Sequence, residues 1–189
     1  MKGKRQTLSH WHKNLLGLGK RVLLVEGDIR RRTLHEYFEN VPRHGIVSVL
    51  NGDKTLAEAV FRNENFGADV LPGEKTGINA ADLFASDKFK KLVEEARASY
   101  DAVIIDTPPV LVVPDARIIA EQVDAIIFTV HWDKTSKAQV DEALRMFHNS
   151  GQRVTGLVLS QISARGMKRY GYGGSYGAHS VYGAKYYTN

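Results

Sequence analysis

The hydrophobic residues of this chain form short, uninterrupted runs separated by longer amphipathic stretches. Five runs predict β-strands, the second of them weakly, at 21–26, 68–71, 102–106, 125–130 and 154–159. Runs rich in Val and Ile, without polar alternation, are typical of parallel strands covered on both faces of a sheet. The pattern therefore predicts a parallel-rich sheet.

Two amphipathic stretches between these runs predict helices, because their apolar residues recur with the i, i+3, i+4, i+7 spacing of one helix face. These residues are Phe89, Leu92, Val93 and Ala96 in the first stretch and Val140, Ala143, Leu144 and Phe147 in the second. Ser86 is placed to cap the first helix and Gly151 to end the second. Alternating strands and helices predict an α/β fold, an open sheet with helices on both faces.

The same pattern divides the chain into an N-terminal segment (1–20), an α/β domain (21–163) and a C-terminal tail (164–189). A chain of 189 residues is long enough for one domain with a substantial core. It contains no Cys, which excludes disulfides, thiolate zinc sites and cysteine-ligated iron–sulfur clusters and suits a reducing cytosol. No apolar run approaches the roughly 18 residues of a membrane-spanning helix, and nothing resembles a signal peptide.

Charge is unevenly distributed along the chain. Residues 1–21 and 143–189 each carry six Lys or Arg and no acidic residue, whereas 22–142 has 14 basic and 21 acidic residues. Two basic ends thus flank an acidic centre. Such ends suit contact with nucleic acid or a membrane surface, but also solvation or docking of a basic tail on the acidic body.

The tail is rich in tyrosine and glycine. Six of the eight tyrosines lie there, at Tyr170, Tyr172, Tyr176, Tyr182, Tyr186 and Tyr187. The tail has too few aliphatic side chains to form a core. We therefore expect its backbone to be largely disordered. Exposed phenols suit the substrate of a tyrosine-modifying enzyme. The alternative is an adhesive low-complexity tail without such a role.

Two of the predicted strands end in acidic residues. The first leads to Glu26 and Asp28, followed by Arg30 and Arg31, and the third ends at Asp106 before Thr-Pro-Pro. Ligands of open α/β sheets bind beyond the carboxyl ends of the strands. A carboxylate there suits a Walker B role, in which it holds magnesium directly or through water. The alternative is an acid that caps a loop or a helix start.

Together, the [DE]-x-D-x-R and D-x-P-P segments resemble the Walker A′ and Walker B motifs of bacterial tyrosine kinases (BY-kinases). These are P-loop ATPases related to ParA and MinD, and they phosphorylate a C-terminal tyrosine cluster. Further segments agree with this resemblance. They are Gly19–Leu24, Val70–Gly73, Tyr100-Asp101, Pro114–Ala116 and Val123–Ala125. The resemblance runs from about Gly19 to the C-terminus, and the tyrosine tail is its most discriminating part.

The resemblance implies a P-loop-like fold with ATP and Mg²⁺ as cofactors. Glu26 and Asp28 would lie beside the magnesium and the attacking phenol, and Asp106 would be the Walker B acid. Arg30 and Arg31 would pair with phosphate or with acids of a neighbouring subunit, the alternative being a solvated turn at a helix start. The six tail tyrosines would be the phosphoacceptors.

The chain departs from the family pattern at the phosphate-binding loop. Gly3 and Lys4 occupy the position of the Gly-Lys of that loop, but Arg5 replaces its hydroxyl residue, and neither the glycine loop nor the strand before it is present. Ser160 stands where the family has an Asn that helps to read adenine. Because the missing strand is normally central, we expect uncovered sheet edges and a fragment or degraded copy of a larger kinase.

Three functions follow from these observations. The first is an ATP-dependent tyrosine autokinase module of exopolysaccharide synthesis and export, with little or no activity expected of this chain by itself. It would be cytoplasmic, self-associating and held at the membrane by a chain-length regulator, without nucleic acid. The second is a non-catalytic module whose tyrosine tail is the substrate of an intact kinase. The third is a ParA/MinD-like ATPase, against which the tail argues.

Overall fold

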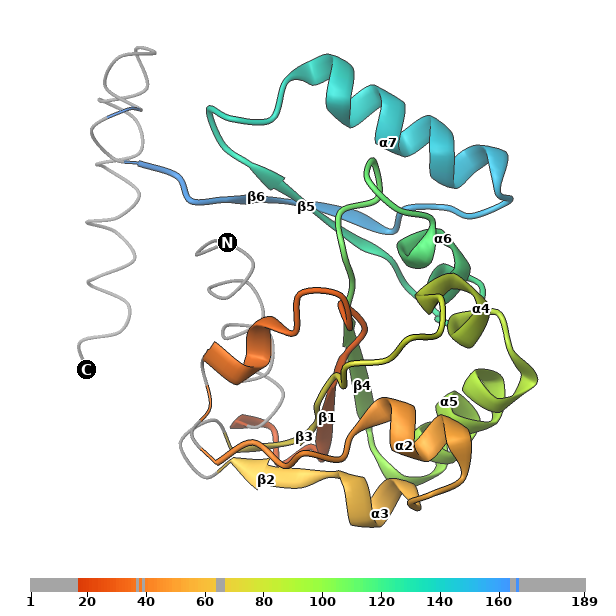
Figure 1. The fold of residues 1–189 in the computed structure, drawn as a ribbon. Coiled ribbons are helices and arrows are strands. Elements are labelled where there is room, and N and C mark those ends of the chain that lie inside the picture. The colour runs from red at the N-terminus through yellow and green to blue at the C-terminus, as the bar shows by residue number, and fades with distance from the viewer. Residues whose placement is uncertain (1–16, 37, 39, 64–66, 164–165, 167–189) are drawn as a thin grey trace, which may run out of the picture.

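The computed structural model describes residues 17–36, 38, 40–63, 67–163 and 166, and Figure 1 shows their arrangement. Gly3, Lys4 and the six tail tyrosines lie outside the described residues, so their predicted roles are not tested. Most of the predicted α/β domain is described.

Four strands form the larger sheet: β1 (Val22–Glu26), β2 (Phe61–Asn63), β3 (Ala68–Leu71) and β4 (Ala102–Asp106). Their order is β2-β3-β1-β4. β1 pairs in parallel with both β3 and β4, whereas β2 pairs antiparallel with β3 at the edge. The three predicted strands of this region are confirmed, and β2 was not predicted.

A separate two-stranded parallel sheet consists of β5 (Ile127–His131) and β6 (Gly156–Ser160). Both lie within two residues of their predicted positions. Among the described strands, β4 pairs only with β1 and β5 only with β6. The parallel-rich α/β architecture is therefore confirmed, but as two sheets with unpaired edges rather than one continuous sheet.

The helices alternate with the strands. They are η1 (Thr33–Glu36, a 3-10 helix), α2 (Ile46–Asn51), α3 (Leu56–Ala59), α4 (Ala80–Phe84), α5 (Asp87–Ser99), α6 (Asp115–Ala120) and α7 (Lys137–Asn149). The predicted cap of α5 is present, since Ser86 accepts a hydrogen bond from the Phe89 amide at 3.3 Å. Gly151 follows α7 with a positive φ of 74°, the left-handed conformation that favours glycine.

The core lies between the larger sheet and helices α2 to α5. Leu23, Val25 and Leu71 are almost completely buried on that face. The opposite face of the sheet is covered by Leu34 of η1 and by Phe38. A smaller cluster joins α6 and α7 to β5, and Figure 1 shows α7 along one side of the β5–β6 pair. This packing fixes the carboxyl ends of β1 and β4, where the predicted site lies.

Candidate functional site

The ends of β1 and β4 bring two acidic residues side by side. Glu26 and Asp106 are register partners in the parallel pairing, so their Cα atoms lie about 5 Å apart. The Gly27 amide donates a hydrogen bond to the Asp106 carbonyl at 2.7 Å. A Cβ at position 27 would lie 2.8 Å from that carbonyl oxygen, which is closer than real contacts allow. Glycine is therefore required for this close approach.

Glu26 is completely buried, and both of its carboxylate oxygens accept backbone hydrogen bonds. Oε1 accepts from the Leu34 amide at 2.7 Å and Oε2 from the Gly73 amide at 2.9 Å. Glu26 thus ties the segment after β1 to the segment after β3. These bonds satisfy the desolvated carboxylate, which would otherwise be costly to bury.

Asp28 lies two residues beyond Glu26 in a tight turn. Its Oδ1 accepts a hydrogen bond from the Arg31 amide at 3.2 Å, and its carbonyl accepts one from the Arg32 amide at 2.8 Å. Two residues span at most about 7 Å, so the Cα atoms of Asp28 and Asp106 lie within about 12 Å of each other. Asp28 and Asp106 are 6% and 8% exposed, so both residues are largely buried.

Within the part of the chain that the structure describes, no set of three or more His, Cys, Asp or Glu side chains is arranged to hold a metal ion. Mg²⁺ needs fewer protein ligands, because one or two carboxylates, water and substrate phosphates usually complete its shell. The oxygen donors of Asp28 and Asp106 fit that mode of binding. The distance between the two carboxylate groups, and their binding of one shared ion, stay predictions.

Arg30 forms a two-bond ion pair with Asp115, the first residue of α6. Arg30 Nε lies 3.0 Å from Asp115 Oδ2, and Nη2 lies 3.2 Å from Oδ1. Nη2 also donates to Asn79 Oδ1 at 3.4 Å. The hydrogen bond to Asp115 raises the pKa of Arg30 above its ordinary value. Asp115 is fully buried, so the pair anchors the turn after β1 to α6.

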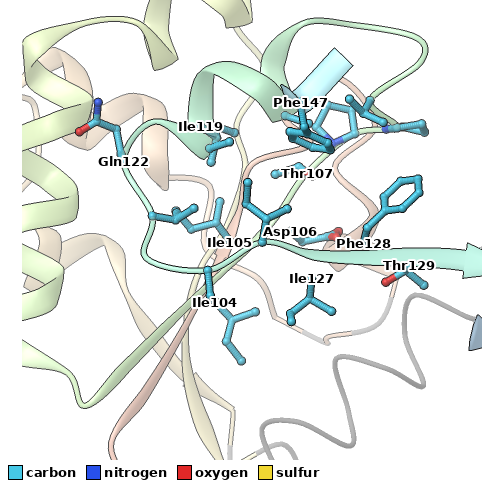
Figure 2. Close-up of a pocket in the computed structure, with 18 of the residues that line it drawn as sticks. Ile104, Ile105, Asp106, Thr107, Ile119, Gln122, Ile127, Phe128, Thr129 and Phe147 are labelled. Carbon is cyan, nitrogen blue, oxygen red and sulfur yellow. The ribbon is translucent and has the colours of Figure 1, made fainter. Parts of the chain in front are cut away.

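Ser160 ends β6 and is buried. Its hydroxyl donates a hydrogen bond to the Val130 carbonyl at 3.1 Å, and its own carbonyl accepts one from the Trp132 amide at 2.9 Å. Ser160 and Asp106 both line a cavity of about 1000 Å³ between β4 and β5. Figure 2 shows this cavity surrounded by side chains from both strands, including Ile104 and Phe128.

Residues 3–154 match a protein-family model described as an AAA domain. The match covers most of the chain. The chain belongs to the AAA domain family. The resemblance to bacterial tyrosine kinases within this superfamily is also confirmed, because the curated relatives of this AAA domain are named as tyrosine-protein kinases.

Three of these relatives show how much of a kinase the AAA domain spans. The tyrosine-protein kinase ptk of Acinetobacter johnsonii is 36% identical over 143 residues, 76% of this chain and 20% of the relative. YwqD of Bacillus subtilis is 33% identical over 157 residues, 83% of this chain and 66% of the relative. A tyrosine-protein kinase in the cps region of Klebsiella pneumoniae is 29% identical over 153 residues, 81% and 21% respectively. The chain thus spans about a fifth of two of these relatives.

Solved structures agree with this assignment. The kinase domain of the Escherichia coli tyrosine kinase ETK matches with a TM-score of 0.75 at 25% identity, over 82% of this chain and 60% of that chain. MinD of Aquifex aeolicus matches with a TM-score of 0.69 at 22% identity, over 90% and 68%. The likeness to MinD shows the shared fold alone.

The residue that sequence reasoning missed is Asp115, which appeared only as part of a matching segment. Its signal was an acidic residue directly after Pro114 at the start of a helix, but nothing in the sequence pairs it with Arg30. The prediction for Arg30 named phosphate, a neighbouring subunit or solvent, whereas in the structure its guanidinium contacts an acid of its own chain. Gly27 and Gly73 likewise matter through close contacts that the sequence does not display.

Proposed function

We propose that this AAA domain is the core of a bacterial protein-tyrosine kinase that acts in exopolysaccharide or capsule production. The observation that carries the proposal is that β1 and β4 are adjacent parallel strands, with Asp106 the last residue of β4 and Asp28 two residues after the end of β1. The division into an N-terminal segment (1–20), an α/β domain (21–163) and a tyrosine tail (164–189) is part of the proposal. The relative in a cps region supports the polysaccharide context.

In this proposal, Asp28 and Asp106 would hold Mg²⁺ together with ATP, and the ion would supply positive charge to neutralise the transferred phosphate. The nucleophile is a tyrosine phenol, whose ordinary pKa of about 10 makes it a weak nucleophile at neutral pH. A carboxylate at this edge would accept the proton as the phenol oxygen bonds to the γ-phosphorus and the bond from that phosphorus to the β–γ bridging oxygen breaks, with ADP as the leaving group. Asp28 is the candidate for that role, because Glu26 uses both oxygens in backbone hydrogen bonds.

Glu26 and Arg30 have positioning roles in the same proposal. Glu26 fixes the turn that carries Asp28 by bonding to the Leu34 amide, and Arg30 holds the same turn against α6 through Asp115. Arg31 contributes its backbone amide to the Asp28 carboxylate. Ser160 lines the neighbouring cavity, and its hydroxyl oxygen could accept a hydrogen bond from an adenine while its proton stays on the Val130 carbonyl.

Nucleotide binding by this chain alone should be weak. Gly3 and Lys4 are the only residues that match a phosphate-binding loop, and several backbone hydrogen bonds to phosphate would be missing. Each charge-assisted bond contributes roughly 1.5–3 kcal/mol, so the loss of two or three weakens ATP binding more than about a hundredfold.

The proposed phosphoacceptors are Tyr170, Tyr172, Tyr176, Tyr182, Tyr186 and Tyr187. The proposed partners are a membrane-spanning chain-length regulator and further copies of the kinase, at the inner face of the cell membrane. None of the described helices is long and apolar enough to cross a membrane. Membrane association would therefore come through the partner in this proposal.

A second candidate is a non-catalytic module whose tail is phosphorylated by an intact kinase. The observation that favours it is the pair of unjoined sheets, since the matching phosphate-binding strand has no counterpart among the described residues. A ParA/MinD-like positioning ATPase shares the fold, but the named kinase relatives and the tyrosine tail favour the kinase family.

Two assays separate these candidates. Calorimetry with MgATP on the wild-type chain and on Asp106→Asn measures whether the acid contributes to nucleotide binding. Phosphorylation of the tail by added kinase domain of Escherichia coli ETK measures substrate function without activity of the chain. Measurable MgATP binding, even if weak, that Asp106→Asn reduces at least tenfold supports the kinase, whereas micromolar affinity would contradict the predicted weak binding. Phosphate transfer to the tail of a chain that itself binds no MgATP supports the substrate module. If the chain neither binds MgATP nor accepts phosphate on its tail, both candidates are excluded.

A further inference from the structure

We propose that Trp132 anchors the tyrosine tail, because its indole ring holds Gly166 and so fixes where residues 167–189 leave the domain. Trp132 and Gly166 are positioning residues in this proposal, since neither would touch the phosphate that is transferred. The consequence for phosphorylation rests on the proposed function, whereas the anchor itself can be tested without a kinase.

Trp132 and Gly166 follow the two strands of the smaller sheet. β5 ends at His131 and β6 at Ser160, and because the strands are parallel, the loops after them begin at the same end of this sheet (Figure 1). The Trp132 amide donates a hydrogen bond to the Ser160 carbonyl at 2.9 Å, which continues the pairing of the two strands by one residue. Trp132 is therefore held beside the point at which the chain leaves β6.

The loop that carries Trp132 is closed by hydrogen bonds. The Thr135 amide donates to the His131 carbonyl at 3.0 Å, and the Thr135 hydroxyl accepts a hydrogen bond from the His131 amide at 3.2 Å. Asp133 lies between them with a positive φ of 59°, a conformation that is unfavourable for residues with a side chain. These contacts fix the backbone on both sides of Trp132.

The segment after β6 has a similar turn. Gln161 follows the strand with a φ of 59°, again in the left-handed conformation. Further along, the Gly166 amide donates a hydrogen bond to Ser163 Oγ at 3.2 Å. Residues with a side chain keep such a conformation only where the surrounding structure holds them in it. Two neighbouring loops at this end of the sheet thus each contain a residue held under local strain.

Gly166 lies directly against the six-membered ring of Trp132. A Cβ at position 166 would lie 2.3 Å from Cη2 and 2.6 Å from Cζ3 of that ring, which is closer than real contacts allow. Both residues are half-buried. The ring therefore occupies the space that a side chain at position 166 would need, and a larger residue there would have to displace it.

An anchor at Gly166 divides the tail tyrosines by distance. Tyr170 is four residues away, a span of at most about 14 Å, whereas Tyr187 is 21 residues away and can reach about 75 Å. Tyr170 would then stay beside its own domain, where a second kinase domain has little room to approach it. Tyr186 and Tyr187 would be the better acceptors for another copy of the kinase.

Trypsin tests the anchor in the full 189-residue chain. It cleaves after Arg165, directly before the anchored residue, and after Lys185, 19 residues beyond Gly166. Cleavage requires a locally open backbone, so its rate reports how often the anchor is released. Trp132→Ala should speed cleavage after Arg165 about fivefold and change cleavage after Lys185 less than about twofold. Mass spectrometry of timed samples measures both bonds in one experiment.

Two controls accompany this variant. Trp132→Phe should keep the slow cleavage after Arg165, because it retains a flat apolar ring beside Gly166. Cleavage after Lys91, within α5, should stay slow in both variants and shows that the domain is folded. Cleavage after Arg165 that Trp132→Ala leaves unchanged in a folded chain would refute the anchor.

Fluorescence tests the same contact from the side of the glycine. The chain has two tryptophans, so Trp11→Phe leaves Trp132 as the single tryptophan. In that background, Gly166→Val should raise acrylamide quenching of Trp132 about twofold, because the added side chain displaces the ring. Gly183→Val makes the same change elsewhere in the tail and should leave the quenching unaltered. Equal quenching in the two variants would also refute the anchor.

Phosphorylation by added kinase domain of Escherichia coli ETK tests the consequence. Tyr186 and Tyr187 should be modified before Tyr170, and Trp132→Ala should raise the rate at Tyr170 about threefold relative to Tyr187. Equal rates at Tyr170 and Tyr187 in the wild-type chain would overturn the effect of distance. A tail that accepts no phosphate, with the expected trypsin and fluorescence results, would contradict the proposed function and support the anchor.

Discussion

Gly27 occupies the point at which the ends of β1 and β4 come closest together, between the two acidic positions. We predict that Gly27→Ala destabilises the fold by about 1–3 kcal/mol, because the added methyl would meet the Asp106 carbonyl at 2.8 Å and Ile119 Cδ1 at 3.1 Å. Gly77→Ala is the control, since a methyl group added there would meet nothing within 4 Å. Urea unfolding measures both, and equal stabilities would contradict the close contact.

The ion pair between Arg30 and Asp115 allows a second prediction at this scale. A double-mutant cycle with Arg30→Gln and Asp115→Asn should give a coupling free energy of about 1–3 kcal/mol, because one partner is fully buried and two hydrogen bonds join them. Arg97 and Asp124 form the control pair at 2.9 Å, with a similarly exposed Arg but an Asp that is 85% exposed.

The control cycle should give less than about 1 kcal/mol, as exposed ion pairs usually do. Thermal or urea unfolding of the wild-type protein and the variants of both cycles supplies the two coupling free energies. A coupling of the buried pair no larger than that of the exposed pair would show that Asp115 does not anchor the turn of Asp28. The turn would then have to be positioned mainly by Glu26.

At the scale of elements, the hydrophobic pattern predicted whether a segment is a helix or a strand more reliably than which strands pair with each other. Helices α5 and α7 were predicted because thirteen-residue helices display several turns of periodicity. Strand β2 was missed because its three residues, Phe-Arg-Asn, form no apolar run and are placed by pairing with β3. Short helices such as α4 and α6 span too few turns to show a period.

In the candidate site too, the positions of residues along the chain could be predicted better than their partners. The positions of Asp28 and Asp106 at neighbouring strand ends could be predicted, because ligands of open α/β sheets bind at that edge, whereas their roles as site residues stay predictions. The partners of Glu26 and Arg30 could not, since the Gly73 amide and Asp115 approach them only through tertiary packing. The structure divides the strands into two sheets, so that β4 and β5 are not paired. The sequence indicated such uncovered edges only because the phosphate-binding strand is missing from it.

At the scale of the whole molecule, the two ends of the chain are basic and its centre is acidic. The central residues 22–142 have 14 basic and 21 acidic side chains, a net charge of −7, whereas the tail from 164 to 189 has four basic residues and no acid. A basic tail is attracted to such an acidic body, either its own or that of a neighbouring subunit. Modification of the tail would therefore alter association without any change in the fold.

Phosphorylation of the tail tyrosines should weaken this attraction in proportion to the number of phosphates. Each phosphate adds roughly −1.5 to −2 charges, so two or three bring the tail from +4 to neutral or negative. Replacement of one tyrosine by Phe should then change oligomer size little, whereas replacement of all six should abolish the response. The measurement is mass spectrometry of protein from its native host, with oligomer size before and after phosphatase treatment. Phosphate found only outside Tyr170–Tyr187, or an oligomer indifferent to phosphatase, would show that the tail does not act as an electrostatic switch.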